Sequence, residues 1–490
     1  MNNTTFTNNM SKCQVKMNVG ELQLRVIIID ILLIGLLMLM QQLFSTIEPN
    51  NQIGLVAVLG LNLTAYILIV SFNVIKRIDG YMIFMALSFV FMFGEQELFL
   101  LGIKMEDMWI YRKYLRYDTI YITGFFTLYT YLVMHIGYSL TLYKRVIKVN
   151  IPAENLDIRS RQLLMKAGII IAILVLYPTV DDLIQNIILT MTMGYGERIY
   201  GTVQNGEVGT DTIMGILTGL MIPALLAMFI GKKKDSNWPW VLIFIYCGLY
   251  MLSGSRLKIF CLLCGIMYAY FLVHSSLTKR KIISVFLAIF AIGTLFSFVS
   301  QKRGDIDSDS KDIIVQLVDN NPVIAIFKEM GFTACATGAV LEHCPSDKPY
   351  LYGKSYLSGL VYTLPNAFTG NYYVKTPEVD SQFKDYITPG SGIGSSFIAE
   401  GYYNFGWLSL LLFFVYGYLF GVYCNKLERV VNACDFPKIF LYIGLFCIII
   451  FYVRSDTRTF FRNFIWYYVP IYLYCKVLKS RRSKIKYRKT

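Results

Sequence analysis

The chain has 490 residues, of which 55% are hydrophobic and only 16% are charged, and its mean hydropathy is +0.50. Because an average soluble domain has about 25% charged residues, this composition excludes an ordinary soluble protein. The formal charge of +14 would suggest a nucleic-acid partner in a soluble protein, but here lysine and arginine cluster at the ends of apolar segments and at the C-terminus. Lipid headgroups account for these clusters, so we expect a lipid bilayer and no nucleic acid as the partner.

Apolar segments recur along the whole chain and predict about twelve membrane-spanning helices. They are Val26–Phe44, Ile53–Val74, Tyr81–Ile103, Ile120–Leu142, Leu163–Val180, Ile213–Ile230, Pro239–Leu252, Leu257–His274, Ile282–Val299, Phe405–Tyr423, Ile439–Val453 and Phe464–Tyr474. The first segment has no small-residue cleavage site before it, so we expect an uncleaved span. The expected fold class is all-α and polytopic, with one large, partly helical outer loop.

The distribution of basic residues predicts that both termini are cytoplasmic. Alternate loops carry lysine and arginine: Lys76-Arg77, Lys144-Arg145, Lys232-Lys233-Lys234, Lys279-Arg280-Lys281, Lys426 with Arg429, and the C-terminal tail. The loop 104–118 departs from this pattern, because Arg112, Lys113 and Arg116 fall on the predicted outer side. We therefore expect three parts, with nine spans in 1–301, the large outer loop in 302–404, and three spans with a basic tail in 405–490.

The outer loop 302–404 lies beyond the reach of cytoplasmic nucleotide sugars, so chemistry there requires substrates delivered by the membrane. Cys335 and Cys344 lie in this loop and either form a disulfide or remain buried thiols. The second half of the loop is rich in tyrosines, whose rings suit either stacking on sugars or anchoring at the membrane interface. They are Tyr350, Tyr352, Tyr356, Tyr362, Tyr372, Tyr373 and Tyr386.

Arginines gather at the predicted outer membrane boundary, where the positive-inside rule predicts few. They are Arg198 in the expected loop 181–211, Arg256, Arg303, Arg454, Arg458 and Arg462. Guanidinium groups bind phosphate oxygens in pairs and stay charged, so the set suggests a site for a lipid-linked diphosphate. The alternative for each arginine alone is a contact with a headgroup or an acidic side chain.

Several carboxylates lie in apolar surroundings. Glu329 lies in an apolar stretch of the outer loop, and Glu400 lies just before the tenth span. Each is either a base or electrostatic stabiliser for a transfer reaction or a structural partner of an arginine. Glu95 and Glu97 lie near the outer end of the third span and are expected to face the protein interior, because carboxylates are costly in lipid. The triplet Asp305, Asp307 and Asp309 is interpreted as a solvated acidic turn, so no metal site is predicted.

Four short motifs resemble the oligosaccharide repeat-unit polymerases of bacteria, the O-antigen or capsule polymerases of the Wzy type. They are Gly254-Ser255-Arg256 at the start of a span, Arg303-Gly304 after another, Glu329-Met330-Gly331, and the stretch GIGSSFIAEGYYNFG from Gly392 to Gly406. The last motif is the specific one. The resemblance covers the topology and these motifs rather than every residue.

The resemblance implies a glycosyltransferase of the bacterial inner membrane, of GT-C-like type, that transfers a growing glycan from undecaprenyl diphosphate to a new lipid-linked repeat unit. It implies no cofactor, and flippase and chain-length regulator proteins as partners. The implied catalytic residues are Glu400, Glu329, Arg256 and Arg303. The implied substrate-binding residues are Arg454, Arg458, Arg462, Arg198, Tyr402, Tyr403 and Asn404.

Two other functions are compatible with the same features. A flippase for lipid-linked oligosaccharides also has many spans, although it would rarely need so large an outer loop. A ligase that moves finished glycan onto a lipid core relies on a histidine in its outer loop, and His343 keeps that interpretation open.

Overall fold

The structure is a computed structural model of the whole chain, and it describes residues 3–75, 78–100, 102, 115–142, 158–193, 213–232, 236–253, 257–274, 327–328, 330–364, 378–387 and 393–487. Every regular element within these residues is a helix. The elements are α1 (Asn3–Leu43), α2 (Pro49–Ile75), α3 (Gly80–Leu100), α5 (Tyr117–Ser139), α6 (Ile158–Leu174), α7 (Leu176–Met193), α9 (Ile213–Gly219), α10 (Met221–Gly231), α11 (Trp238–Leu252), α12 (Leu257–His274), α16 (Thr333–His343), α17 (Lys354–Val361), α19 (Val379–Ile387), α20 (Phe397–Phe405), η5 (Gly406–Leu408), α21 (Ser409–Asn432), α22 (Phe436–Tyr452), α23 (Thr457–Asn463), η6 (Phe464–Tyr468) and α24 (Val469–Tyr487).

Apolar helices of membrane-spanning length confirm the polytopic membrane protein. Six of the described helices are long and apolar enough to cross a bilayer, or seven if α6 and α7 form one broken span. The six are Gly20–Leu43, Pro49–Ile75, Gly80–Leu100, Tyr117–Ser139, Met214–Gly231 and Phe397–Asn432, and α11, α12 and α22 are shorter apolar helices. The expected number of about twelve spans therefore stays a prediction, and the expected span Ile282–Val299 lies outside the described residues.

The fifth expected span is bent rather than straight. The axes of α6 and α7 differ by 55°. Pro178 stands in the first turn of α7, and a proline ring has no N–H for the helical ladder and clashes with the preceding turn. The helix then continues to Met193, so Asp181 and Asp182, which we expected in an outer loop, lie exposed on α7.

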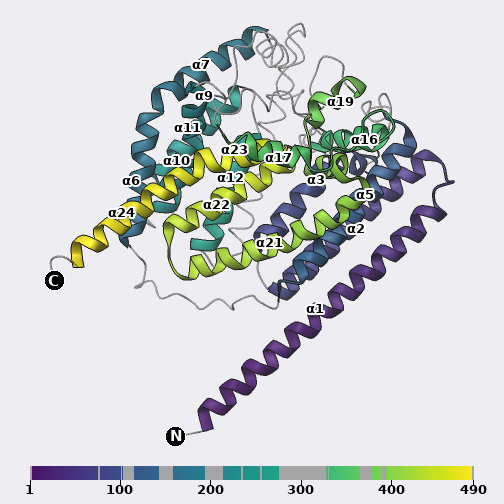
Figure 1. Cartoon of the computed structure of the whole chain (residues 1–490), viewed down its shortest axis with the longest axis horizontal. Helices are drawn as coiled ribbons and strands as arrows, with labels where there is room; N and C mark the ends of the chain where they lie inside the picture. The colour runs from purple at the N-terminus through teal and green to yellow at the C-terminus, as the bar shows by residue number, and fades with distance from the viewer. Residues whose placement is uncertain are drawn as a thin grey trace.

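The helices form two groups that meet at α22 (Figure 1). One group contains α1, α2, α3, α5 and α21, and the other contains α6, α10, α11, α12 and α24. α22 contacts helices of both groups, α3 and α21 on one side and α6, α10, α12 and α24 on the other. The short helices α16, α17, α19 and α23 gather at the upper side of the view, and both chain ends lie on its lower left side.

Glycines allow α5 and α21 to pack at close range. A Cβ atom added at Gly417 would overlap the carbonyl oxygen of Met134, and one added at Gly137 would overlap the carbonyl oxygen of Phe414. Small residues that let backbones approach are typical of helix contacts in membranes. The α5–α21 contact fixes the position of α20, which precedes α21 in the chain.

A buried hydrogen bond between a carboxyl group and an imidazole ring attaches α1 to the bundle. Only 22% of the apolar window of α1 is buried, so few contacts hold this helix. Asp30 Oδ2 lies 2.9 Å from His135 Nδ1 on α5, and Asp30 Oδ1 accepts a hydrogen bond of 2.9 Å from the Tyr66 hydroxyl on α2. Asp30 and His135 are both fully buried, so each satisfies the polar group of the other away from lipid.

Glu95 and Glu97 face the protein interior, as expected. Glu95 is fully buried and Glu97 is nearly so. A Cβ atom added at Gly331 would overlap the backbone nitrogen of Glu95, and one added at Gly94 would meet the backbone of Gly331. The glycine of the Glu329-Met330-Gly331 motif therefore lets the start of the α16 region lie directly against the end of α3.

Candidate active site

The motif that precedes α20 fixes where this helix begins. Gly394 has a φ of +72°, a left-handed conformation that favours glycine. Asp380 Oδ1 on α19 accepts hydrogen bonds from the backbone nitrogens of Ile393, at 2.6 Å, and Gly394, at 2.7 Å. Ser396 caps α20 by accepting a 3.0 Å bond from the nitrogen of Ala399. The loop helix α19 and the motif are therefore connected through one aspartate.

Glu400 is a fully engaged, buried carboxylate on α20. Its Oε1 accepts a 2.7 Å bond from Ser355 Oγ of α17. Its Oε2 lies 2.9 Å from Thr457 N, 2.8 Å from Thr457 Oγ1 and 3.0 Å from the Tyr452 hydroxyl. Only 2% of the residue is exposed. Both oxygens therefore have donors, and the side chain joins α20 to α17 and to the turn between α22 and α23.

The residues that follow Glu400 hold the loop around α17. Asn404 Oδ1 accepts from the nitrogen of Gly353 at 3.0 Å, and its Nδ2 donates to Ser355 Oγ at 2.7 Å. The carbonyl oxygens of Tyr403 and Asn404 accept bonds from the chain just before Gly353. Tyr402, Tyr403 and Asn404 are all buried. Their backbone and amide groups thus position the loop, and Tyr403 also lines the pocket described below.

The turn between α22 and α23 presents three arginines on one short stretch. Asp456 caps α23 by accepting a 2.7 Å bond from the nitrogen of Thr459. This cap starts a helix that carries Arg458 and Arg462, while Arg454 lies just before the cap. Burial raises the pKa of the Asp456 carboxyl above its ordinary value.

Arg458 and Arg462 share one aromatic ring. The guanidinium carbons of Arg458 and Arg462 lie 4.6 Å and 4.7 Å from the centre of the Tyr362 ring. Arg462 also donates to the Tyr362 hydroxyl and lies 4.8 Å from the centre of the Trp466 ring. Arg458 forms an ion pair with Glu378. Cation–π contacts hold both arginines in fixed directions.

Arg454 lies beside the glycine motif. Its Nε is close to Gly394, and its charge lowers the pKa of Asp380, although burial, the larger effect, raises that pKa above its ordinary value. Among the described residues, no acidic side chain lies within ion-pair distance of Arg454. The guanidinium of Arg454 is therefore the best placed of the three to receive an anion.

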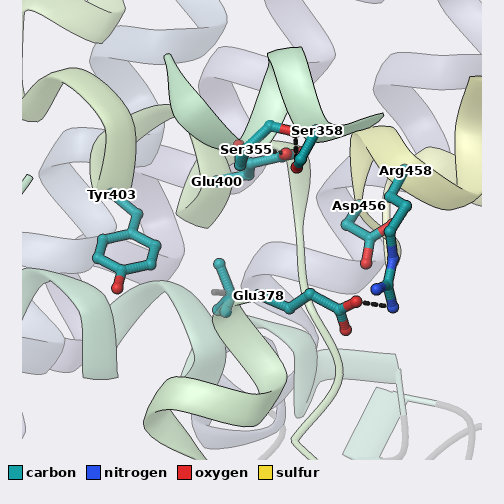
Figure 2. Close-up of a pocket in the computed structure, with 8 residues that line it drawn as sticks. Ser355, Ser358, Glu378, Glu400, Tyr403, Asp456 and Arg458 are labelled. Atoms are coloured by element: carbon teal, nitrogen blue, oxygen red, sulfur yellow. Dashed lines mark hydrogen bonds and ion pairs between the residues drawn. The ribbon is translucent and has the colours of Figure 1, made fainter. Parts of the chain in front are cut away.

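A small pocket lies where these parts meet (Figure 2). Its lining residues are Ser355, Ser358, Glu378, Val379, Glu400, Tyr403, Asp456 and Arg458. They come from α17, α19 and its preceding residue, α20, and the α22–α23 turn. In Figure 2, Glu378 and Arg458 point toward each other across the pocket, and Asp456 lies beside them. The pocket thus combines carboxylates, a guanidinium and hydroxyl groups.

The expected site residues fall into two sets. Glu400, Tyr403 and Arg458 line the pocket, and the other expected residues that the structure describes, Arg454, Arg462, Tyr402 and Asn404, belong to the elements that build it. Arg198, Arg256, Arg303 and Glu329 lie outside the described residues. The acidic triplet of Asp305, Asp307 and Asp309 also lies outside them.

Several residues of the pocket were not expected from the sequence. Ser355 and Thr457 donate to Glu400, and Glu378 pairs with Arg458. They are far apart in the chain and belong to no recognisable motif. Only Asp456 had a local signal, since aspartate is one of the preferred residues at the N-cap of a helix.

Cysteines and acidic residues supply no metal site in the described part of the chain. No group of three or more His, Cys, Asp or Glu side chains there could hold a metal ion. Cys335 and Cys344 are buried and are not joined by a disulfide. They stand at opposite ends of α16, so nine residues of helix, about 13 Å, separate them along the axis, and burial raises the pKa of Cys344 to about 12.

The sequence matches the family described as O-antigen polysaccharide polymerase Wzy over residues 26–484, and the chain therefore belongs to that family. No curated protein and no solved structure matches the chain significantly.

Proposed function

We propose that this member of the polymerase family joins oligosaccharide repeat units carried on undecaprenyl diphosphate, at the outer face of the bacterial inner membrane. A terminal hydroxyl of the incoming unit attacks the anomeric carbon of the growing glycan. The new glycosidic C–O bond forms as the bond to the diphosphate breaks. Undecaprenyl diphosphate leaves with the electron pair, and the hydroxyl proton passes to a base.

The observation that carries this proposal is the grouping of Arg454, Arg458 and Arg462 beside a carboxylate-lined pocket. The leaving diphosphate gains negative charge as the C–O bond breaks, and fixed guanidinium groups stabilise such charge. Arg454 has no acidic partner among the described residues, so it is free to bind phosphate oxygens. Arg256 and Arg303 complete the cationic set in this proposal.

Glu378 and a diphosphate oxygen are alternative partners for Arg458. Glu378 forms an ion pair with the Arg458 guanidinium inside the pocket. A diphosphate oxygen would bind the same guanidinium and would have to replace Glu378. The side chains of both residues are about one-fifth exposed, at 22% each, so the pair is reachable from solvent. Exchange of one anion for the other would admit the diphosphate to the pocket.

Glu400 serves as a positioning residue in this proposal. Its Oε1 accepts a hydrogen bond from Ser355, and its Oε2 accepts from Thr457 and Tyr452, so both oxygens are already held by groups of the scaffold. By joining α17, α20 and the arginine turn, it holds the pocket walls at a fixed spacing. The proton acceptor in this proposal is then Glu329 or another carboxylate of the outer loop.

Tyrosines of the outer loop supply a surface for sugars. Tyr352 is 77% exposed and stands next to Gly353, whose nitrogen is bound by Asn404. An exposed ring with a hydroxyl tip stacks on sugar faces and donates hydrogen bonds. Tyr402 and Asn404 support this loop, so their role in substrate binding is indirect in this proposal. Tyr403 lines the pocket, so its role is direct.

The test is deletion of the gene followed by complementation, with lipid-linked glycans resolved on a gel. The deletion should collapse the ladder to one repeat unit, and the wild-type chain should restore it. Arg458→Ala should fail to restore the ladder despite normal membrane insertion, whereas Glu378→Gln should restore it. Single units trapped on the cytoplasmic leaflet would indicate a flippase instead, and full-length polymer that lacks its acceptor would indicate a ligase.

A further inference from the structure

A second cationic site lies at the opposite end of the bundle from the pocket. It is formed by Arg161 in the first turn of α6 and Lys232 at the end of α10. These helix ends lie on the side of the view in Figure 1 where the C-terminus also lies. The site takes no part in the proposed transfer reaction.

The two cations are close together, and no acidic side chain of the described residues pairs with either of them. Arg161 donates to the carbonyl oxygen of Lys232, and the positive charge of Arg161 adds to burial in lowering the pKa of Lys232. Among the described residues, no carboxylate lies within ion-pair distance of either side chain, and the nearby Asp435 is paired with Lys438 at 3.0 Å. Two adjacent like charges repel each other, so an anion that binds both is favoured.

The polar atoms of these side chains are only partly satisfied. Lys232 is 3% exposed and its Nζ donates to the carbonyl oxygen of Ser236 at 3.1 Å. The Nε of Arg161 is buried and has no hydrogen-bond partner. An unpaired buried guanidinium nitrogen is costly, and a phosphate oxygen is the partner that an arginine fork fits best.

Aromatic and glycine contacts make the site rigid. The Nζ of Lys232 lies 5.4 Å from the centre of the Phe229 ring and 5.7 Å from that of Trp240. The guanidinium carbon of Arg161 lies 5.6 Å from the centre of the Phe436 ring. Close approach of α6 and α10 is possible because a Cβ at Gly231 would meet the backbone of Met165 at 2.6 Å.

Apolar side chains exposed to lipid flank the cations. Ile158 is 62% exposed one turn before Arg161, and Trp238 is 39% exposed at the start of α11. Tryptophan is enriched at the membrane–water interface, where its ring contacts both headgroups and acyl chains. A ligand with an anionic phosphate next to hydrocarbon chains matches this arrangement.

We infer that the adjacent ends of α6 and α10, beside α11 and α22, bind the headgroup of an anionic phospholipid. The phosphodiester contacts Arg161 and Lys232 at this end of the two helices, and its acyl chains lie along the exposed faces near Ile158 and Trp238. Basic pockets between helix ends are a known way for membrane proteins to hold such lipids. The bound lipid fastens α6 and α10 to α22, which leads directly to the arginine turn.

The test uses the full-length chain purified in a nonionic detergent. Its unfolding temperature is measured during titration with short-chain phosphatidylglycerol, which is anionic, with phosphatidylcholine of the same chain length, which is zwitterionic, and with inorganic phosphate. Only phosphatidylglycerol should raise the temperature, and it should do so saturably. An equal effect of phosphatidylcholine, or an effect of phosphate alone as large as that of phosphatidylglycerol, would overturn the lipid assignment.

Matched variants locate the site. The double variant Arg161→Gln, Lys232→Gln should bind phosphatidylglycerol at least about tenfold more weakly. The double variant Lys166→Gln, Lys426→Gln removes the same number of positive charges at exposed positions, leaves the Asp435–Lys438 pair intact, and should bind as the wild type does. Equal affinities of the two double variants would place the lipid elsewhere. If the first variant does not fold, Arg161→Lys keeps the charge but loses the fork, and unchanged affinity there would contradict the proposal.

Discussion

Replacement of Glu400 by glutamine tests whether this residue holds the pocket together or only exchanges protons. The best orientation for the amide keeps its oxygen at the site that accepts from Thr457 N and turns its nitrogen toward Ser355 Oγ. An amide nitrogen cannot accept the hydroxyl proton that Ser355 now donates to Glu400. Ser355 Oγ also already accepts from Asn404 Nδ2, so the variant loses this hydrogen bond. The remaining hydrogen bonds lose the charge of the carboxylate.

The magnitude follows from the number of bonds affected. A hydrogen bond to a charged group contributes about 1.5–3 kcal/mol and a neutral one about 0.5–1.5 kcal/mol. The loss of charge from two or three bonds therefore lowers the free energy of unfolding by about 3 kcal/mol. Since the unfolding entropy scales with length, a chain of this size should melt about 3 °C lower.

The assay is thermal unfolding of the purified chain in detergent, together with the glycan ladder at a permissive temperature. Glu342→Gln is the matched control, because Glu342 also accepts from two partners, Arg116 Nε at 3.0 Å and Thr119 Oγ1 at 2.7 Å. Arg116 is 73% exposed, so this control should lose less than about 1 kcal/mol. A Glu400→Gln chain that melts as the wild type does, yet makes no polymer, would refute the positioning role and indicate a proton acceptor.

Arg454→Ala should shorten the glycan ladder to single units, with a loss of transfer rate of about 10²-fold. Arg429→Ala, on the exposed end of α21, should leave the ladder intact. Equal ladders from the two variants would contradict a role of Arg454 in binding the diphosphate. Burial raises the pKa of Asp380, so the stability that its protonated form provides is present below about pH 4 and is lost as the pH rises through the raised pKa. Asparagine does not titrate, so the melting temperature of Asp380→Asn should rise relative to that of the wild type when both are measured at increasing pH from 4 upward. A difference in melting temperature that stays constant with pH would contradict this prediction. Gly417→Val should destabilise the chain by about 1–3 kcal/mol, because its side chain would overlap the carbonyl of Met134, and a wild-type melting curve would show that the α5–α21 contact can relax.

Hydropathy and charge predict the class of this protein well, because lipid imposes a simple rule on every span. Long apolar runs must form helices, and carboxylates within them must face protein, as Glu95 and Glu97 do. The same rule does not predict a bend. The break between α6 and α7 depends on Pro178, whose effect on the helix axis is not visible in a hydropathy profile.

The pocket was only partly predictable. Arg454, Arg458 and Glu400 stood out because charged residues are rare beside apolar segments. Glu378 and Ser355 did not, because serines and glutamates are common in polar loops and nothing local marks the few that meet a partner. Their roles come from tertiary contacts, such as the pairing of Glu378 with Arg458, which a single sequence does not encode in any short pattern.

The buried contact between Asp30 and His135 also has a consequence for how the protein is made. The two residues are separated by 105 positions, and ribosomes add about 5–20 residues per second. Asp30 therefore enters the membrane about 5–20 s before its partner is synthesised, at a depth where an unpaired carboxylate is strongly disfavoured. We expect the insertion machinery to retain α1 until α5 arrives, so that the first helix to be made is among the last to be released into lipid.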